Sequence, residues 1–312
     1  MNILQFKRVV PKDRLVHVVE SEKIECSKEM DAMFESLVEQ RLAVASSVFD
    51  EYKYAGSTAV NIFEAINFPS QLNNMASFIT QLKSYLRIDT QIVGIEFRPQ
   101  IQETPQINLI EEISDNSLLI QWVSGRKRPE LDGYGIVERL VPKLETMIIR
   151  FGSPVFVELR SSYNQRNTYL GLLASLLSQD EHSTGLNIEW VPITKVTEDE
   201  AEQIAAKLKA GLLESEHLGE GCIGKYGFTA APGIENLKDQ KQFQDFITGK
   251  PYLAQVFHVD YVEAETGYTT KVKFKINHKG GFEFKSKVSE RIIKRILDVF
   301  VEVRYHKVAS GE

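Results

Sequence analysis

The sequence predicts an α+β protein built from two mixed halves, and three observations support this fold class. Apolar residues alternate with polar ones in three short runs between residues 252 and 286, which is the period of half-buried strands. After Ser286 the apolar residues recur at helical spacing, with Ser289 placed as an N-cap. In the first half, an amphipathic helical pattern precedes short β-branched and aromatic runs. The second half is therefore predicted to contain a three-stranded antiparallel meander closed by a helix.

The core of this β-β-β-α unit, over residues 252–301, follows from its periodicities. Because side chains alternate between the two faces of a strand, a slip of one residue would exchange the buried and the exposed sets. Burial of Phe284 is therefore a direct test of the register. We expect the core to contain Phe257, Phe274, Phe284, Ile293 and Leu297.

The first half is assigned from the same patterns. Its short strands are predicted to form an antiparallel sheet, and the soft boundary near residues 190–197 gives an N-terminal domain of residues 1–192 and a C-terminal domain of residues 193–312. Thr197 and Glu200 fit a capping box at the start of a helix. We expect strands at 2–10, 58–66, 91–98, 106–112, 117–123, 155–159 and 186–190, helices at 27–52, 70–86, 134–149 and 169–177, and a basic connection at 124–129.

Composition indicates a cytoplasmic protein that does not enter membranes. The chain of 312 residues holds 37 Lys and Arg against 43 Asp and Glu, a net charge of −6. It has no run of 18 apolar residues, and its first residues lack the apolar segment of a signal peptide. The two cysteines, Cys26 and Cys222, stand far apart and outside any paired motif, so neither a disulfide framework nor a thiolate zinc site is predicted.

The charge is distributed very unevenly. Between residues 271 and 295 there are nine Lys and Arg against two Glu, which predicts a basic surface that attracts polyanions. Lysines on a strand also prevent edge-to-edge aggregation, and this structural explanation stays open. A second basic cluster stands before Pro129. The candidate nucleic-acid-binding residues are Lys271, Lys273, Lys275, Lys285, Lys287, Arg291, Lys294 and Arg295, with Arg126, Lys127 and Arg128 as the second cluster.

Several motif matches lack the neighbouring residues or secondary structure that their usual function requires. Gly219 to Lys225 matches both G-x-G-x-x-G and G-x-x-x-x-G-K, but it follows a helix instead of a strand, and Tyr226 replaces the Ser or Thr that would reach magnesium. The six histidines show no metal-ligand spacing. We therefore predict no metal site and no cofactor for the binding function, and a flexible connection at the glycines.

One catalytic arrangement is also open. Asp260, Glu283 and Lys285 fall on the polar sides of the predicted meander, and carboxylates with a nearby lysine are the groups that metal-dependent phosphodiester cleavage uses. With the helix at 236–247 before it, this segment of about 70 residues resembles the core of PD-(D/E)xK nucleases. The resemblance implies a Mg²⁺-dependent nuclease with these three catalytic residues. The family's aspartate normally opens the second strand, where this chain has Thr269-Thr270-Lys271.

The prediction we favour is a binding protein without chemistry of its own, whose basic C-terminal face docks nucleic acid or an acidic protein surface. This function needs no unusual geometry, whereas the nuclease needs an aspartate that the pattern does not supply. The alternatives are the Mg²⁺-dependent nuclease and a structural adaptor subunit of a multi-protein complex.

Overall fold

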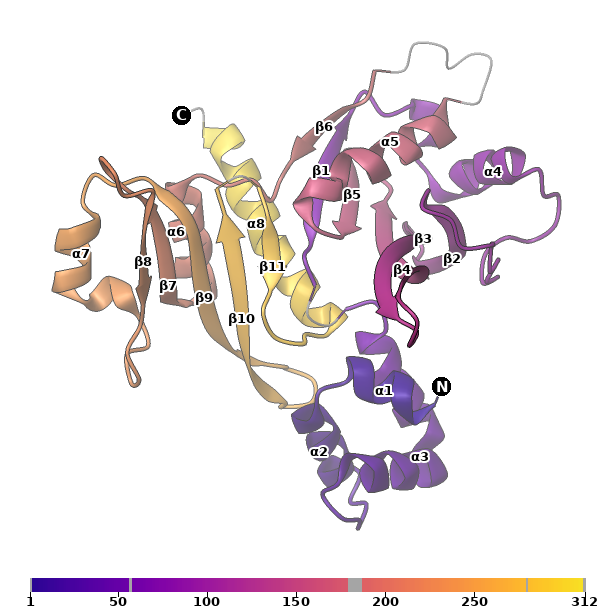
Figure 1. Ribbon diagram of the computed structural model, residues 1–312, viewed down its shortest axis with the longest axis horizontal. Helices are drawn as coiled ribbons and strands as arrows, with labels where there is room; N and C mark the ends of the chain where they lie inside the picture. The colour runs from indigo at the N-terminus through magenta and orange to yellow at the C-terminus, as the bar shows by residue number, and fades with distance from the viewer. Residues whose placement is uncertain (1, 56–57, 179–186, 279, 311–312) are drawn as a thin grey trace. The chain divides into compact units, whose positions relative to one another are not determined.

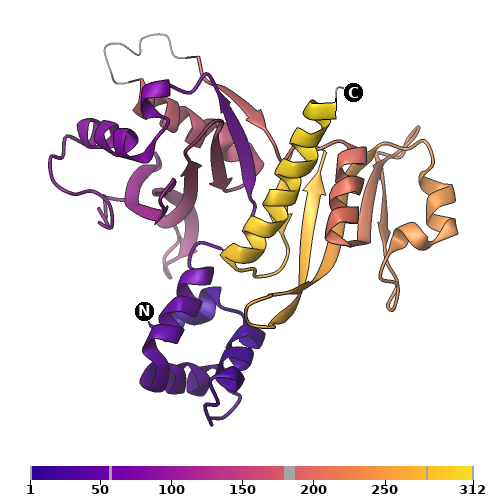
Figure 2. The ribbon, with the colours of Figure 1, turned by 180° about the vertical axis from the view of Figure 1, so that it is seen from behind.

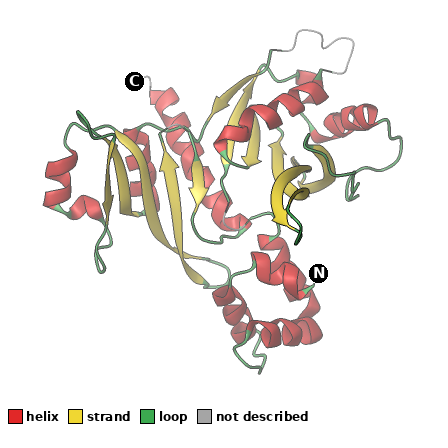
Figure 3. Cartoon of the chain, viewed as in Figure 1, coloured by secondary structure: helices red, strands yellow, loops and turns green. Residues whose placement is uncertain are grey.

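The structure is a computed structural model, and it describes residues 2–55, 58–178, 187–278 and 280–310 (Figure 1). The fold is α+β, as the sequence predicted, with helices and antiparallel strands in both parts of the chain (Figure 3). Contacts divide the chain into two compact units. Unit 2 is the continuous stretch 60–194, and unit 1 combines residues 1–59 with residues 195–312. Among the described residues, no helix has the length and apolar character that crossing a bilayer requires.

Unit 2 is a six-stranded antiparallel sheet with two helices. Its strands lie in the order β2-β3-β4-β5-β1-β6. Aromatic and aliphatic side chains from the sheet and both helices, among them Phe63, Phe78 and Trp122, form one core. The elements are β1 (Asn61–Ile66), η1 (Ser70–Leu72), α4 (Met75–Leu86), β2 (Gln106–Ser114), β3 (Ser117–Leu131), β4 (Ile136–Arg150), β5 (Val155–Arg160), η2 (Tyr163–Gln165), α5 (Arg166–Leu177) and β6 (Glu189–Pro192).

Three predictions in unit 2 are wrong, and one long hairpin explains two of them. The third is the strand expected at 91–98, a segment with turns and a single isolated bridge at Glu96. The helix predicted at 134–149 is the strand β4, which begins at Ile136, and the expected connection at 124–129 is part of β3. The carboxylate of Asp132 accepts hydrogen bonds from the amides of Tyr134 (3.0 Å) and Gly135 (3.2 Å), which fixes a tight turn. Gly133 supplies the positive φ of 94° in that turn. The turn residues, rather than the apolar spacing, decide the structure of this segment.

Unit 1 begins with three helices, α1 (Ile3–Val9), α2 (Lys12–Ser21) and α3 (Met30–Tyr52), which share an apolar core. The strand predicted at 2–10 is therefore wrong. Asn2 and Gln5 form a capping box, because the Asn2 side chain accepts from the Gln5 amide (2.9 Å) and the Gln5 side chain accepts from the Asn2 amide (3.1 Å). These two hydrogen bonds satisfy backbone amides at the helix N-terminus and so favour a helix over a strand in this segment. The sequence analysis placed these residues in a domain of residues 1–192, whereas their contacts group them with residues 195–312.

The rest of unit 1 is a five-stranded antiparallel sheet in the order β11-β10-β9-β7-β8. Helices α6 and α8 lie side by side against one face of it (Figure 2). The predicted meander is β9-β10-β11, and two strands that were not predicted, β7 and β8, extend it. β8 lies in the segment expected to be a glycine-rich connection. The elements are α6 (Glu198–Leu208), β7 (Gly211–Leu218), β8 (Lys225–Thr229), η4 (Leu237–Asp239), α7 (Lys241–Ile247), β9 (Tyr252–Val262), β10 (Thr269–Asn277), β11 (Phe282–Phe284) and α8 (Glu290–Ser310).

The predicted register of the meander is confirmed. Phe274 pairs with Phe257 on one side and with Phe284 on the other, and all three side chains are buried. Ile293 and Leu297 on α8 are buried as well, and the Phe300 ring lies 4.9 Å from the Phe282 ring. The Thr197 capping box is also present, with its hydroxyl 3.3 Å from the Glu200 amide. The apolar face of this sheet therefore packs toward the helices and leaves the lysines on the other face.

Candidate functional site

The face of the five-stranded sheet opposite α6 and α8 brings together four of the predicted lysines; it is turned toward the viewer in Figure 1. On β10, Lys271 lies opposite Asp260 of β9 and Lys273 lies opposite His258. Lys275 lies opposite Glu283 of β11. The Lys285 amide donates to the Lys273 carbonyl (2.8 Å), so Lys285 adjoins Lys273 across the strands. We call Lys271, Lys273, Lys275 and Lys285 the lysine face.

Three of these four lysines already have carboxylate partners. The Lys285 ammonium lies 2.7 Å from Glu283, and the Lys275 ammonium lies 3.3 Å from Glu216. Lys271 lies between Glu235 (3.7 Å) and Asp260 (3.8 Å). The basic surface predicted from the linear charge is therefore partly offset by acidic residues from other strands and loops. Exposed pairs of this kind are worth about 0–1 kcal/mol, so a phosphate can compete for these lysines.

Lys275 reaches its partner by crossing a neighbouring strand. Its side chain extends over β9, where Ala254 and Val256 are small and buried, to Glu216 on β7. The same carboxylate contacts Lys225 at 3.3 Å. Burial raises the pKa of Glu216, but the hydrogen bonds from Lys225 and Lys275 outweigh burial and hold the pKa below its usual value. These residues line a shallow pocket of about 240 Å³ on the lysine face.

Lys273 stands at the centre of the lysine face without a counter-charge. It is exposed and makes no ion pair with any of the described residues. Its neighbours across the strands are His258 and Lys285, and Lys271 and Lys275 flank it along β10. His258 uses its Nε2 to contact the Glu235 carbonyl at 2.8 Å. The carboxylates thus lie around the rim, and the centre carries positive charge.

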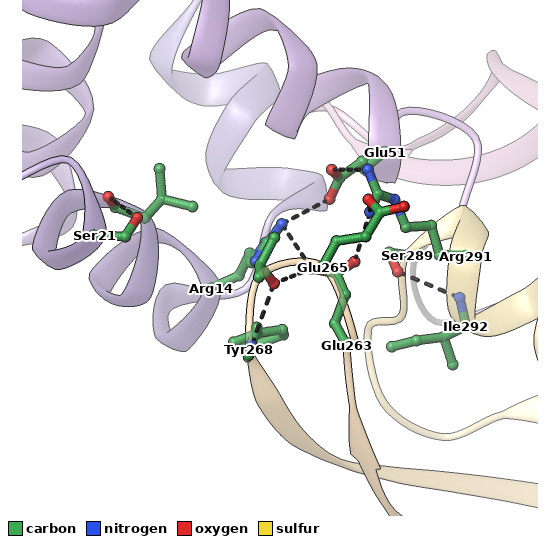
Figure 4. Close-up of polar contacts among 12 residues, drawn as sticks. Arg14, Ser21, Glu51, Glu263, Glu265, Tyr268, Ser289, Arg291 and Ile292 are labelled. Atoms are coloured by element: carbon green, nitrogen blue, oxygen red, sulfur yellow. Dashed lines mark hydrogen bonds and ion pairs between the residues drawn. The ribbon is translucent and has the colours of Figure 1, made fainter.

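The other seven predicted binding residues lie outside this face, and two of them, Lys287 and Arg291, contact other groups of unit 1. The Lys287 ammonium donates to the Lys7 carbonyl (3.0 Å) at α1, and burial lowers the pKa of Lys287. Arg291, in the first turn of α8, contacts Glu51 (3.5 Å) and Glu263 (3.4 Å) and also Glu265 (Figure 4). Both cations already contact groups of unit 1, so they are poor candidates for binding a nucleic acid.

Arg291 belongs to an ion network that joins the N-terminal helices to the β9–β10 turn (Figure 4). Arg14 of α2 lies 3.2 Å from Glu51 and 3.2 Å from Glu263, and the Arg14 side chain is only 4% exposed. Burial raises the pKa of Glu51, against the attraction of Arg14 and Arg291. Tyr268 completes the contact through its hydroxyl, which donates to Asp13 at 2.6 Å. This network links α2 and α3 to the β9–β10 turn and to the first turn of α8.

The remaining predicted cations are exposed. Lys294 and Arg295 on α8 make no ion pair with the described residues. In unit 2, the Lys127 ammonium lies 2.7 Å from Glu103, and this hydrogen bond raises the pKa of Lys127. Its neighbours Arg126 and Arg128 are exposed on β3. Unit 2 therefore carries a small basic surface of its own on the strand that was expected to be a loop.

The structure does not bring the proposed catalytic carboxylates together. Asp260 lies opposite Lys271, whereas Glu283 lies opposite Lys275 on the other side of β10. Four residues along a strand span about 13 Å, so the two carboxylates cannot share an ion near 2.1 Å from each. Glu283 instead pairs with Lys285. In the part of the chain that the structure describes, no group of three His, Cys, Asp or Glu side chains could hold a metal ion.

The sequence analysis missed a buried serine–histidine pair on the helix-facing side of the sheet. The Ser215 hydroxyl lies 2.7 Å from His217 Nε2, and His217 Nδ1 lies 3.0 Å from the Lys250 carbonyl. The spacing of two residues on a strand could have indicated that both share a face. Ser215 is 1% exposed and His217 is 0% exposed, so no substrate reaches the hydroxyl. The pair satisfies polar groups inside the core.

A scan of known protein families finds no model that matches this chain, and a search of curated proteins finds none that matches it either.

Proposed function

We propose that this is a cytoplasmic nucleic-acid-binding protein and that the lysine face is its binding surface. The observation that supports this proposal is the position of Lys273, an exposed cation whose nearest side chains on the same face are other bases. Repulsion among these groups is relieved when an anion binds at the centre. The proposal needs no catalytic step and no cofactor.

The rim of carboxylates also shapes the proposed mode of binding. Lys271 and Lys285 form exposed ion pairs and Lys275 forms a partly buried one, and a phosphate backbone can replace these contacts. Each such exchange releases counter-ions from the nucleic acid but leaves one carboxylate unpaired. We therefore expect modest affinity and little sequence preference, because backbone contacts position a protein and carry no direct sequence information.

The test replaces the central lysine. Lys273→Glu is expected to weaken binding to a DNA duplex and to lower the slope of log affinity against log salt by about 0.9, since one phosphate contact is lost. Affinity would be measured by fluorescence anisotropy with a duplex and with single-stranded RNA, at several salt concentrations. The variant should remain folded, because the side chain is exposed.

Lys241→Glu is the matched control, since it makes the same change of charge at an exposed position on α7, away from the lysine face. Equal losses in the two variants would mean that net charge, and not this site, governs binding. Absence of binding by the unmodified protein even at low salt would reject nucleic acid as the partner. The lysines would then be explained by protection of β10, whose first residues lie beyond the short β11.

A further inference from the structure

The β3–β4 hairpin of unit 2 extends beyond its sheet as a two-stranded arm. β2 pairs with β3 only as far as Val123, and β5 pairs with β4 only over residues 146–150. From Ser124 to Leu131, β4 is the only strand that pairs with β3, and the turn that joins them follows. At the base of this stretch the Gly125 amide also donates to the Gln102 carbonyl. A two-stranded ribbon by itself is marginally stable in water. We call residues 124–144 the arm.

The arm exposes a concentration of large apolar side chains. Leu131 is 80% exposed, Ile136 is 74% exposed and Leu144 is 51% exposed, and Tyr134 at the turn is fully exposed. Single exposed apolar residues are ordinary on a protein surface, but a contiguous group marks an interaction site. The arm is such a group.

The register separates the two faces of the arm. Leu131 pairs with Ile136 and Lys127 pairs with Leu140, so these four side chains share one face with Pro129 and Glu138. Arg126, Arg128 and Arg139 lie on the other face with Val137 and Val141. One face is therefore mainly apolar and the other mainly basic. We call the first the apolar face of the arm.

We propose that the apolar face is the contact between two copies of this chain. Its charged groups are one cation, Lys127, and one anion, Glu138, which lie two positions apart along the ribbon. Lys127 also contacts Glu103 of its own chain, in an exposed pair that a carboxylate of a second copy can replace. When two arms pack face to face and run in opposite directions about a two-fold axis, each Lys127 approaches the Glu138 of the other copy. The face is thus complementary to itself, whereas a nucleic acid would meet Glu138 and aliphatic groups that offer it no hydrogen bond.

The size of the arm limits the strength of this contact. Six residues of strand span about 20 Å and two strands are about 10 Å wide, so each copy buries only a few hundred Å². Interfaces of this size are small and belong to weak or transient complexes. We therefore expect a reversible dimer with a micromolar dissociation constant.

The experiment measures the mass in solution by sedimentation velocity from about 1 μM to about 500 μM, which brackets a weak association. The unmodified chain should pass from one copy to two over this range. Ile136→Asp, on the apolar face, should weaken the dimer at least tenfold. Val137→Asp, the adjacent residue on the opposite face, should leave it unchanged.

Circular dichroism establishes that both variants are folded, and Leu140→Asp replaces Ile136→Asp if that variant is not. A chain that stays monomeric throughout the range overturns the proposal. So does a dimer that survives the folded substitution on the apolar face, or one that Val137→Asp disrupts equally. Nucleic-acid binding is read out at Lys273, on another unit, so the two proposals succeed or fail separately.

Discussion

Glu158→Gln is expected to lower the free energy of unfolding of unit 2 by about 3–5 kcal/mol, because it removes the one carboxylate that two guanidinium groups share. Glu158 on β5 is fully buried, and its oxygens lie 2.7 Å from Arg150 and 2.7 Å from Arg160. The Arg160 side chain is only 2% exposed. Glutamine keeps one amide oxygen at this position but removes the negative charge that the buried Arg160 guanidinium contacts.

The same site predicts how stability depends on pH. Burial alone would raise the pKa of Glu158, but Arg160 and Arg150 outweigh burial and hold the pKa below its usual value. A carboxylate whose pKa is lowered by folding contributes stability that is fully present above the unfolded value of about 4.3 and is lost as the pH falls. The unmodified protein should therefore lose stability below about pH 4.3 more steeply than Glu158→Gln does.

The two tryptophans, Trp122 and Trp190, both lie in unit 2, so urea unfolding followed by tryptophan fluorescence reports on this unit alone. Glu103→Gln is the control, because it makes the same chemical change in an ion pair whose partners are 63% and 54% exposed. We expect it to cost far less than Glu158→Gln, because water screens an exposed ion pair. If Glu158→Gln lowers the free energy of unfolding no more than Glu103→Gln does, the buried ion pairs of Glu158 do not stabilise unit 2.

Phe284→Ala is expected to cost unit 1 about 3–5 kcal/mol, through lost burial and the cavity that remains. The ring is 0% exposed and lies 5.0 Å from the Phe282 ring. The backbone amide of Phe284, which donates to the Thr58 carbonyl at 2.9 Å, is kept in this variant. The loss therefore measures side-chain packing on β11.

Unfolding of unit 1 would be followed by far-UV circular dichroism, with the tryptophan signal of unit 2 as an internal reference. Phe246→Ala is the matched control, because that ring is 46% exposed on α7 and should cost far less. If Phe284→Ala and Phe246→Ala lower the free energy of unfolding equally, the buried Phe284 ring stabilises unit 1 no more than an exposed ring does.

The sequence analysis correctly predicted the elements in which the local residue pattern and the tertiary packing favour the same secondary structure. Alternation over Val272, Phe274 and Ile276 and the capping box at Thr197 are local signals that the rest of the fold reinforces. The β3–β4 hairpin and the first helix were missed because short polar signals, at Asp132 and at Asn2, override an ambiguous apolar pattern. No local pattern could show that residues 1–59 pack with the C-terminal part of the chain.

The candidate site was predicted in part for a related reason. Alternation is enough to place Lys271, Lys273 and Lys275 on one side of β10. It says nothing of Glu216 and Glu235, which come from other segments and reduce the positive charge of that face. It also could not show that Arg291 faces Glu51 and Glu263, more than 200 positions away in one case. The net charge of a sequence segment therefore does not give the charge of the surface on which its side chains lie.

The ion network of Arg14 has a consequence for the order in which the protein is completed during synthesis. The three N-terminal helices share a core of neighbouring residues and can assemble early. Glu263 and Arg291 leave the ribosome more than 200 residues after Glu51, which at about 5–20 residues per second is a delay of roughly 10–40 s. Through that interval unit 2 emerges whole and free to fold, while the Arg14 and Glu51 side chains stay hydrated. The N-terminal helices are thus made before unit 2, but their ion pairs with Glu263 and Arg291 form only after unit 2 has been made.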